Sequence, residues 1–123
     1  MRLLLVEDDE LQSRVVAEAC RSMRHEVVHA ASYDEALAAL QSTPIDAVLS
    51  DDTLGVGGTG TALRRWVDEN RASLPFALMS GHYAKNHVPN ETGRWFLAKP
   101  FRMADLEQLL SEIAGLVATR SRD

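Results

Sequence analysis

Short, mainly apolar runs alternate along this chain with longer segments of mixed polarity. Five such runs occur, at residues 3–6, 25–30, 45–51, 75–80 and 95–98. The first is continuously apolar, and so is the centre of the third at 47–49, which is typical of strands that are buried on both faces of a parallel sheet. The pattern predicts five strands.

The segments between these runs have the periodicity of amphipathic helices. In residues 10–23, apolar side chains recur at every fourth position, which predicts a helix that buries them. These side chains are Leu11, Val15, Ala19 and Met23. Asp9 precedes the segment and is its predicted N-cap.

Three further helices are predicted at residues 35–41, 61–72 and 103–118. Ser32 and Glu35 form a capping-box pattern ahead of the first of these, and Pro44 ends it. The last helix carries the longest apolar stripe, Leu106, Leu109, Leu110, Ile113, Leu116 and Val117.

Strands that alternate with helices predict an α/β domain, a doubly wound parallel sheet with helices on both faces. In such a sheet the carboxyl ends of all strands meet at one edge, where ligands bind. Three acids, a hydroxyl and a cation follow the predicted strands: Glu7, Asp8, Asp51, Ser80 and Lys99. From residues 45–60 alone, Asp51 could equally begin a turn; the other strand ends favour a site.

Composition narrows the function classes. The chain has 123 residues, enough for one domain, with 18 acidic and 13 basic side chains and a net charge of −5. A basic stripe is lacking, so nucleic acid is not an expected direct partner. Cys20 is the only cysteine, which excludes a disulfide framework. The first apolar run is too short for a signal peptide or membrane span, so we expect a cytoplasmic protein without a membrane partner.

Several carboxylates that meet at one sheet edge repel one another when all are ionised, so a cation is needed to neutralise them. Oxygen ligands without His or Cys favour Mg²⁺, which uses one or two carboxylates together with phosphate oxygens. A hydroxyl and an ammonium group beside that metal suit a phosphoryl group. The predicted chemistry is phosphoryl transfer to a carboxylate.

The chain resembles the receiver domain of two-component response regulators over nearly its whole length. The motifs that carry the resemblance are LLVEDDE, DAVLSDDTL, ALMSGH and FLAKPF, in this order at strand ends. The resemblance implies a flavodoxin-like strand order, 2-1-3-4-5, with a domain at residues 1–119 and a disordered tail at 120–123. It also implies a protein that catalyses only its own phosphorylation and dephosphorylation and passes a phosphorelay signal to a protein target.

By the same resemblance, Asp51 is the phosphoacceptor. Its phosphoryl donor would be the phosphohistidine of a sensor histidine kinase or of a histidine phosphotransfer protein. Glu7 and Asp8 would hold Mg²⁺ together with Asp51, and the backbone carbonyl of Thr53 would complete the protein ligands.

The resemblance also implies residues that respond to phosphorylation. Lys99 would pair with a phosphoryl oxygen, and its bond to Pro100 would be cis. Ser80 would turn its hydroxyl onto the phosphoryl group. Phe96 stands where the family has an aromatic switch residue, although it could equally be a core residue of the fifth strand.

Other interpretations remain open. Gly55, Gly57 and Gly60 match the dinucleotide-binding pattern G-x-G-x-x-G, but the preceding aspartates would repel a pyrophosphate and residues 70–90 hold no acid for a ribose. A Mg²⁺-dependent phosphatase would need a general acid where Thr53 stands. A receiver-like docking module that is never phosphorylated is a further alternative. Asp52 is a rival acceptor, but strand alternation points it to the opposite face.

The chain departs from the family pattern after the fourth strand. Only 18 residues separate Ser80 from Lys99, and Asn86, Pro89 and Gly93 among them disfavour a helix. We predict that the fourth helix is shortened or absent. We expect no output domain after the last helix, and a stand-alone receiver and a receiver of a hybrid kinase are both compatible with the sequence.

Overall fold

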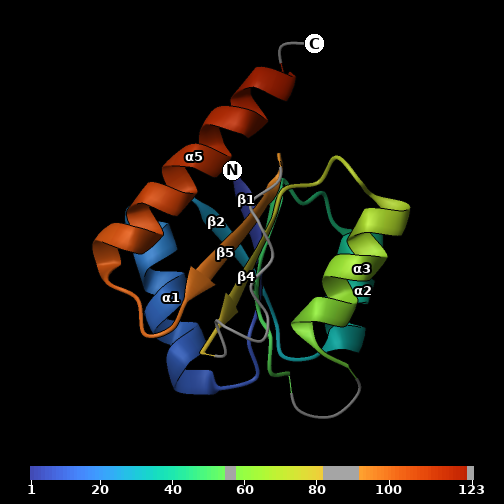
Figure 1. The fold of residues 1–123 in the computed structure, drawn as a ribbon, viewed down its shortest axis with the longest axis horizontal. Coiled ribbons are helices and arrows are strands. Elements are labelled where there is room, and N and C mark those ends of the chain that lie inside the picture. The colour runs from blue at the N-terminus through green and yellow to red at the C-terminus, as the bar shows by residue number, and fades with distance from the viewer. Residues whose placement is uncertain (55–57, 82–91, 122–123) are drawn as a thin grey trace.

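The five predicted strands form one parallel sheet (Figure 1). The computed structural model describes residues 1–54, 58–81 and 92–121. The strands are β1 (Arg2–Val6), β2 (Glu26–Ala30), β3 (Ala47–Asp51), β4 (Phe76–Ser80) and β5 (Arg94–Ala98). Their order is β2-β1-β3-β4-β5, and every neighbouring pair is parallel. The predicted fold class and strand order are therefore confirmed.

Four helices cover the sheet within the described residues, two on each face. They are α1 (Glu10–Ser22), α2 (Tyr33–Ser42), α3 (Gly60–Asn70) and α5 (Met103–Ser121). In Figure 1, α1 and α5 lie on one side of the sheet and α2 and α3 on the other. None of these described helices is long and apolar enough to cross a membrane.

Two predictions concern segments outside the described residues. The shortened or missing fourth helix concerns residues 82–91, and two of the glycines in the G-x-G-x-x-G pattern lie in residues 55–57. Up to Gly81 and again from Thr92, the described chain between β4 and β5 forms no helix. Residues 122 and 123 also lie outside the described part, so the predicted tail stays a prediction.

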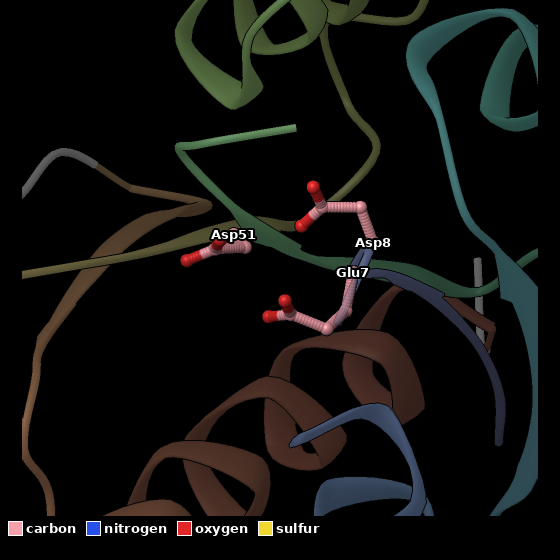
Figure 2. Close-up of side chains that lie close together, drawn as sticks. All are labelled: Glu7, Asp8 and Asp51. Atoms are coloured by element: carbon pink, nitrogen blue, oxygen red, sulfur yellow. The ribbon is translucent and has the colours of Figure 1, made fainter. Parts of the chain in front are cut away.

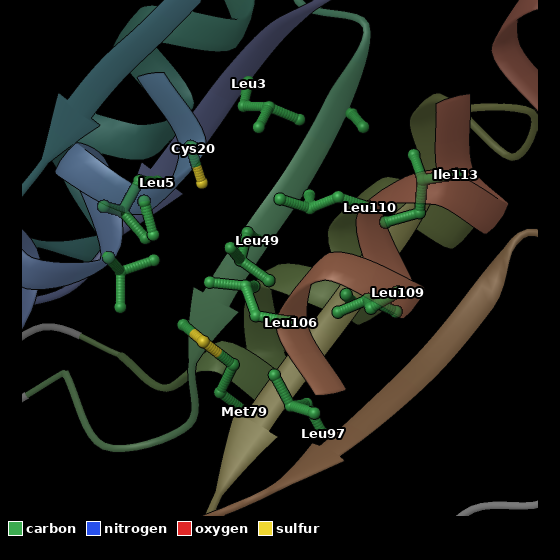
Figure 3. Packing of buried hydrophobic residues seen from close by; sticks show 14 of the residues in the cluster. Leu3, Leu5, Cys20, Leu49, Met79, Leu97, Leu106, Leu109, Leu110 and Ile113 are labelled. Atoms are coloured by element: carbon green, nitrogen blue, oxygen red, sulfur yellow. The ribbon is translucent and has the colours of Figure 1, made fainter. Parts of the chain in front are cut away.

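The continuous apolar runs are explained by burial on both sides of the sheet. Leu3 and Leu5 of β1 belong to a cluster under α1 and α5, whereas Leu4 and Val6 belong to a second cluster under α2 and α3. Alternate residues of a strand point to opposite faces, so a strand covered on both faces must be apolar throughout. Figure 3 shows the first cluster, where Leu106 and its neighbours from α5 meet the strands. Each fully buried leucine contributes about 1.5–3 kcal/mol of transfer free energy.

Side chains cap the first two helices as predicted. The Asp9 carboxylate accepts a hydrogen bond from the backbone N–H of Gln12 at 2.9 Å, so Asp9 is the N-cap of α1. The Ser32 hydroxyl accepts from the Glu35 N–H at 3.2 Å and donates to the Glu35 carboxylate at 3.3 Å. The bonds from Gln12 N–H and Glu35 N–H satisfy donors that the first turn of a helix leaves without a partner.

The predicted buried face of α1 is right at its end, where Ala19 is buried and Met23 packs against the core, and wrong at its start. Leu11 and Val15 are exposed, at 70% and 52% of their surface. Besides Ala19, the helix buries Ser13, Val16, Ala17 and Cys20. A four-residue step turns a helix by 400°, so a strict four-residue repeat drifts around it, whereas spacings that mix three and four stay on one face. The two exposed residues stand beside the carboxyl edge of the sheet.

A buried arginine fastens the start of β5, which begins one residue earlier than predicted. Arg94 is 5% exposed. Its guanidinium group donates to the Asp68 carboxylate at 2.7 Å and to the backbone carbonyls of Leu74 at 2.7 Å and Ala72 at 3.2 Å. These bonds tie β5 to the end of α3 and to the connection before β4. They help to fix the strand that carries Lys99.

Candidate functional site

Three carboxylates converge at the carboxyl edge of the sheet. Glu7 and Asp8 directly follow β1, and Asp51 ends the hydrogen-bonded neighbour β3. One carboxylate oxygen of each residue lies within 4.8 Å of the others. Figure 2 shows Glu7 and Asp8 leaving the end of β1 and Asp51 approaching from β3. Glu7 and Asp51 are buried, whereas Asp8 is exposed, so solvent reaches the cluster from the Asp8 side.

Lys99 brings a positive charge to this cluster from β5. Its Nζ atom lies 2.6 Å from Oδ1 of Asp51 and 3.4 Å from Oε2 of Glu7. It also donates a hydrogen bond to Oε1 of Gln12 at 2.9 Å. The ammonium group therefore has three acceptors, one for each of its N–H bonds.

Burial and charge shift the pKa values of this group. Burial raises the pKa of Glu7, and the neighbouring Asp51 charge adds to the rise, against the hydrogen bond from Asp9 N–H and the Lys99 charge. Burial alone would lower the pKa of Lys99, but its hydrogen bond and ion pair with Asp51, supported by Glu7, raise the pKa above its ordinary value. Lys99 therefore stays charged at neutral pH.

Two hydrogen bonds that the sequence pattern did not predict hold Glu7, one at its carboxylate and one at its backbone carbonyl. The Asp9 N–H donates to Oε1 of Glu7 at 3.1 Å. Nε2 of His29 lies 2.8 Å from the Glu7 carbonyl oxygen, and since a carbonyl only accepts, the imidazole must donate. His29 ends up here because β2 is the neighbour of β1, which is a long-range relationship.

Gly60 permits the close approach of α3 to the acceptor strand. A Cβ atom at Gly60 would overlap the carbonyl oxygen of Asp51 and crowd the side chain of Leu78. Any other residue would push α3 away from the end of β3. This glycine is therefore needed for the close packing of α3 at the site. The sequence pattern alone also allowed a role in binding phosphate.

Asp52 points away from the cluster, as strand alternation predicts. Its Oδ1 accepts from the hydroxyl of Thr61 at 2.7 Å and from the Thr61 N–H at 3.2 Å. Asp52 thereby caps the start of α3. Neither its carboxylate nor that of any fourth residue joins the acidic cluster in the described part of the chain.

The remaining candidate residues lie at or near the same edge. Ser80 is buried at the end of β4, and its carbonyl accepts from the N–H of Lys99 at 2.8 Å. The peptide bond from Lys99 to Pro100 is cis. Phe96 is half-buried in β5, pairs in register with Leu78 and packs against the cluster under α2 and α3. Thr53 is exposed in the segment after β3.

The donor set fits a small hard cation. Three carboxylates share the cluster, and Lys99 supplies one positive charge against them. All available ligands are oxygen atoms, and one of the three carboxylates is open to solvent, as a metal that keeps several waters requires. Of the cations that proteins bind through oxygen, Mg²⁺ suits this arrangement.

Comparison with known proteins identifies relatives of this chain. A family model described as the response regulator receiver domain matches residues 3–111. None of the curated protein sequences matches significantly.

Many solved structures share the fold. The receiver domain of the hybrid histidine kinase CckA is 29% identical, covers 92% of this chain and 98% of its own, and has a TM-score of 0.74. The receiver domain of a Pseudomonas aeruginosa sensor histidine kinase, with a magnesium ion in its active-site cleft, is 25% identical, covers 93% and 97%, and has a TM-score of 0.80. The response regulator TrrA of Thermotoga maritima, in complex with Mg²⁺ and BeF, is 18% identical, covers 91% and 97%, and shares the fold with a TM-score of 0.81.

Proposed function

The chain belongs to the response regulator receiver family, and on this premise we propose that Asp51 is its phosphoacceptor. The donor is the phosphohistidine of a sensor histidine kinase or of a histidine phosphotransfer protein. The observation that carries the proposal is the place of Asp51, which lies within 4.8 Å of the Glu7 and Asp8 oxygens and 2.6 Å from Lys99. Asp52 is a weaker candidate because its carboxylate is engaged by Thr61.

Glu7, Asp8 and Asp51 would hold Mg²⁺, with the backbone carbonyl of Thr53 as a further ligand. The metal, when bound, neutralises these carboxylates and the phosphoryl oxygens. The exposed carboxylate of Asp8 leaves the cluster open on the side from which a donor must approach. Magnesium in the related sensor-kinase receiver supports this assignment.

The proposed transfer is a single displacement at phosphorus. A carboxylate oxygen of Asp51 attacks the phosphorus atom, and a P–O bond forms while the P–N bond to the donor imidazole breaks. The imidazole nitrogen keeps the electron pair and takes up a proton from solvent when needed. Lys99 stays charged, and during the transfer it exchanges its ion pair with the Asp51 carboxylate for one with a phosphoryl oxygen.

Phosphorylation adds a charge of about −1.5 to −2 beside Lys99 and Ser80. We expect the Ser80 hydroxyl to donate to the phosphoryl group and Phe96 to change its packing, which biases the arrangement of β4, β5 and their loops toward the signalling state. The bond from Lys99 N–H to the Ser80 carbonyl already couples the ends of these two strands. The signal then passes to a protein target.

Intact-mass analysis tests the acceptor. Wild type, Asp51→Asn and Asp52→Asn are incubated with acetyl phosphate and Mg²⁺, and parallel samples contain EDTA. We expect one phosphoryl group on wild type and on Asp52→Asn, none on Asp51→Asn, and none in EDTA. Phosphorylation that persists in Asp51→Asn would move the acceptor to another residue.

A second measurement addresses the switch. Beryllofluoride with Mg²⁺ mimics the acyl phosphate, and the backbone amide spectrum of residues 80–100 should then change. Wild-type protein that binds Mg²⁺ but takes up neither phosphate nor beryllofluoride would refute the acceptor role and favour a docking module.

A further inference from the structure

Gln12 contacts the proposed site although it belongs neither to the carboxylate cluster nor to the motifs of the sequence. Its Oε1 atom lies 2.9 Å from Nζ of Lys99, closer than the 3.4 Å that separates Nζ from Glu7. The donor is an ammonium group, and such charge-assisted hydrogen bonds are stronger than neutral ones. Gln12 is thus one of the principal partners of Lys99.

The backbone of Gln12 is fixed with respect to Glu7. The Gln12 N–H donates to Asp9 at 2.9 Å, and the Asp9 N–H donates to Oε1 of Glu7 at 3.1 Å. Lys99 closes the ring by contacting both Gln12 and Oε2 of Glu7. Glu7 after β1 and Gln12 in the first turn of α1 therefore hold the end of the Lys99 side chain at two points.

An apolar cavity beside Lys99 explains why a second point of attachment matters. The cavity has a volume of about 570 Å³ and lies between α1 and the start of α5. Glu7, Gln12 and Lys99 are among its lining residues, and the other lining residues are apolar, among them Val15, Phe101 and Met103. The flexible stem of a lysine can turn into such a space when only one or two acceptors hold its ammonium group.

We propose that Gln12 is a positioning residue, which holds the Lys99 ammonium group over Asp51 and away from the cavity. The inference rests on the proposed function, because it assigns to Gln12 a part in binding the phosphoryl group. Two acceptors of Lys99 are carboxylates whose charge is altered when metal and phosphoryl group arrive. The Gln12 amide is neutral and lies outside that cluster, so it keeps its hold on Lys99 while the other two bonds change.

The test replaces Gln12 with methionine, which has a similar length and no comparable acceptor. Gln108→Met is the matched control, since Gln108 is exposed on α5. Hydrogen exchange of the Lys99 ammonium group, followed by ¹⁵N NMR without metal, reports the hold on Lys99 directly. Beryllofluoride binding with Mg²⁺, compared with binding of Mg²⁺ alone, reports whether the positioned Lys99 contributes to binding of a phosphoryl group.

We expect Gln12→Met to raise the ammonium exchange rate and to weaken beryllofluoride binding by about fivefold each, as the loss of one solvent-exposed hydrogen bond predicts. Mg²⁺ affinity and the unfolding temperature should stay as in wild type. Gln12→Glu, which keeps an acceptor, should restore slow exchange, and Gln108→Met should change nothing.

Unchanged exchange in Gln12→Met would overturn the inference, as would an equal loss of Mg²⁺ and beryllofluoride binding, which indicates a general disturbance of the site. Failure of wild type to bind beryllofluoride would instead overturn the proposed function. The exchange measurement needs neither ligand, so the two failures are distinguishable.

Discussion

Lys99 reaches Asp51 across an intervening strand. Lys99 directly follows β5, and Asp51 ends β3. These strands are separated in the sheet by β4, yet Nζ of Lys99 lies 2.6 Å from Oδ1 of Asp51. The Lys99 side chain passes over the end of β4, where the Ser80 carbonyl binds the Lys99 N–H. The ion pair and this backbone hydrogen bond together join the ends of three neighbouring strands at the edge where a phosphoryl group would bind.

Lys99→Met should destabilise the metal-free protein and strengthen Mg²⁺ binding. The substitution leaves the carboxylates of Glu7 and Asp51 buried without their cation, which we expect to lower the free energy of unfolding by about 1–2 kcal/mol, because Lys99 itself is partly exposed. Without the Lys99 charge, Mg²⁺ is repelled less at the carboxylate cluster, so its affinity should increase. Urea unfolding in EDTA and calorimetric Mg²⁺ titration measure the two effects.

Arg14→Met is the control for the loss of a positive charge, since the pair of Arg14 with Glu10 is exposed on both sides. It should change the unfolding free energy by less than about 0.5 kcal/mol. Equal effects of the two substitutions would show that the Lys99 ion pairs contribute no more than a surface pair.

Gly60→Ala and Gly115→Ala should change stability in opposite directions. A Cβ at Gly60 would overlap the Asp51 carbonyl, whereas a Cβ at Gly115 in α5 meets no atom within 4 Å. We expect the first substitution to lower the unfolding free energy by about 2–3 kcal/mol and the second to raise it by about 0.5–1 kcal/mol. Urea unfolding of both variants is the measurement, and a stabilising Gly60→Ala would refute the close packing of α3 on β3.

Local patterns in the sequence were sufficient for the order of the elements and for the residues at strand ends. Asp51 follows a run that had to be a buried strand, and parallel topology brings it to the edge that also holds Glu7 and Lys99. Such reasoning needs only the alternation of strands and helices. It extends to the caps, because Asp9 and Ser32 act on residues three positions away.

Local patterns could not predict contacts between side chains that are far apart in the sequence. Arg94 lies just before the predicted fifth strand, and no local pattern predicts that it is buried with Asp68 and with carbonyls of the α3–β4 connection as partners. Gln12 and His29 gained their partners only from the way α1 and β2 flank β1. The face of α1 was misjudged for a related reason, since a four-residue repeat resembled a buried stripe while Leu11 is exposed beside the site.

Stability should depend on pH through Cys20. The thiol is 1% exposed, and burial raises its pKa to about 11, whereas a thiol in an unfolded chain has a pKa of about 8.5. The folded state therefore keeps a proton that the unfolded state loses. The contribution is complete below about pH 8.5 and is lost as the pH rises toward 11, at about 1.4 kcal/mol per pH unit.

Comparison with Cys20→Ala isolates this effect, because all other titrating groups are common to both proteins. Wild type should be the more stable by about 1 kcal/mol at pH 7, owing to the packing of the sulfur atom. The advantage should begin to shrink near pH 8, reverse slightly above pH 9, and leave the variant more stable by about 1 kcal/mol at pH 10. Urea unfolding at pH 7, 8.5 and 10 measures it; a constant difference across this range would contradict a buried thiol with a raised pKa.

Asp8→Asn should reverse the order of stability when Mg²⁺ is added. In EDTA the substitution removes one of three mutually repelling carboxylates, and the exposed side chain of Asp8 gives up no buried contact, so the unfolding free energy should rise by about 0.5–1 kcal/mol. With Mg²⁺ the wild type gains binding free energy that grows with the metal concentration, while the variant has lost a ligand and gains less. Thermal unfolding along a Mg²⁺ series should therefore give two curves that cross. Glu112→Gln, which removes an exposed acid of α5 outside the cluster, should run parallel to wild type throughout. Parallel curves for Asp8→Asn as well would mean that Asp8 is not a ligand, and the metal would then have to be held by Glu7 and Asp51, whose shared ion pair with Lys99 opposes its binding.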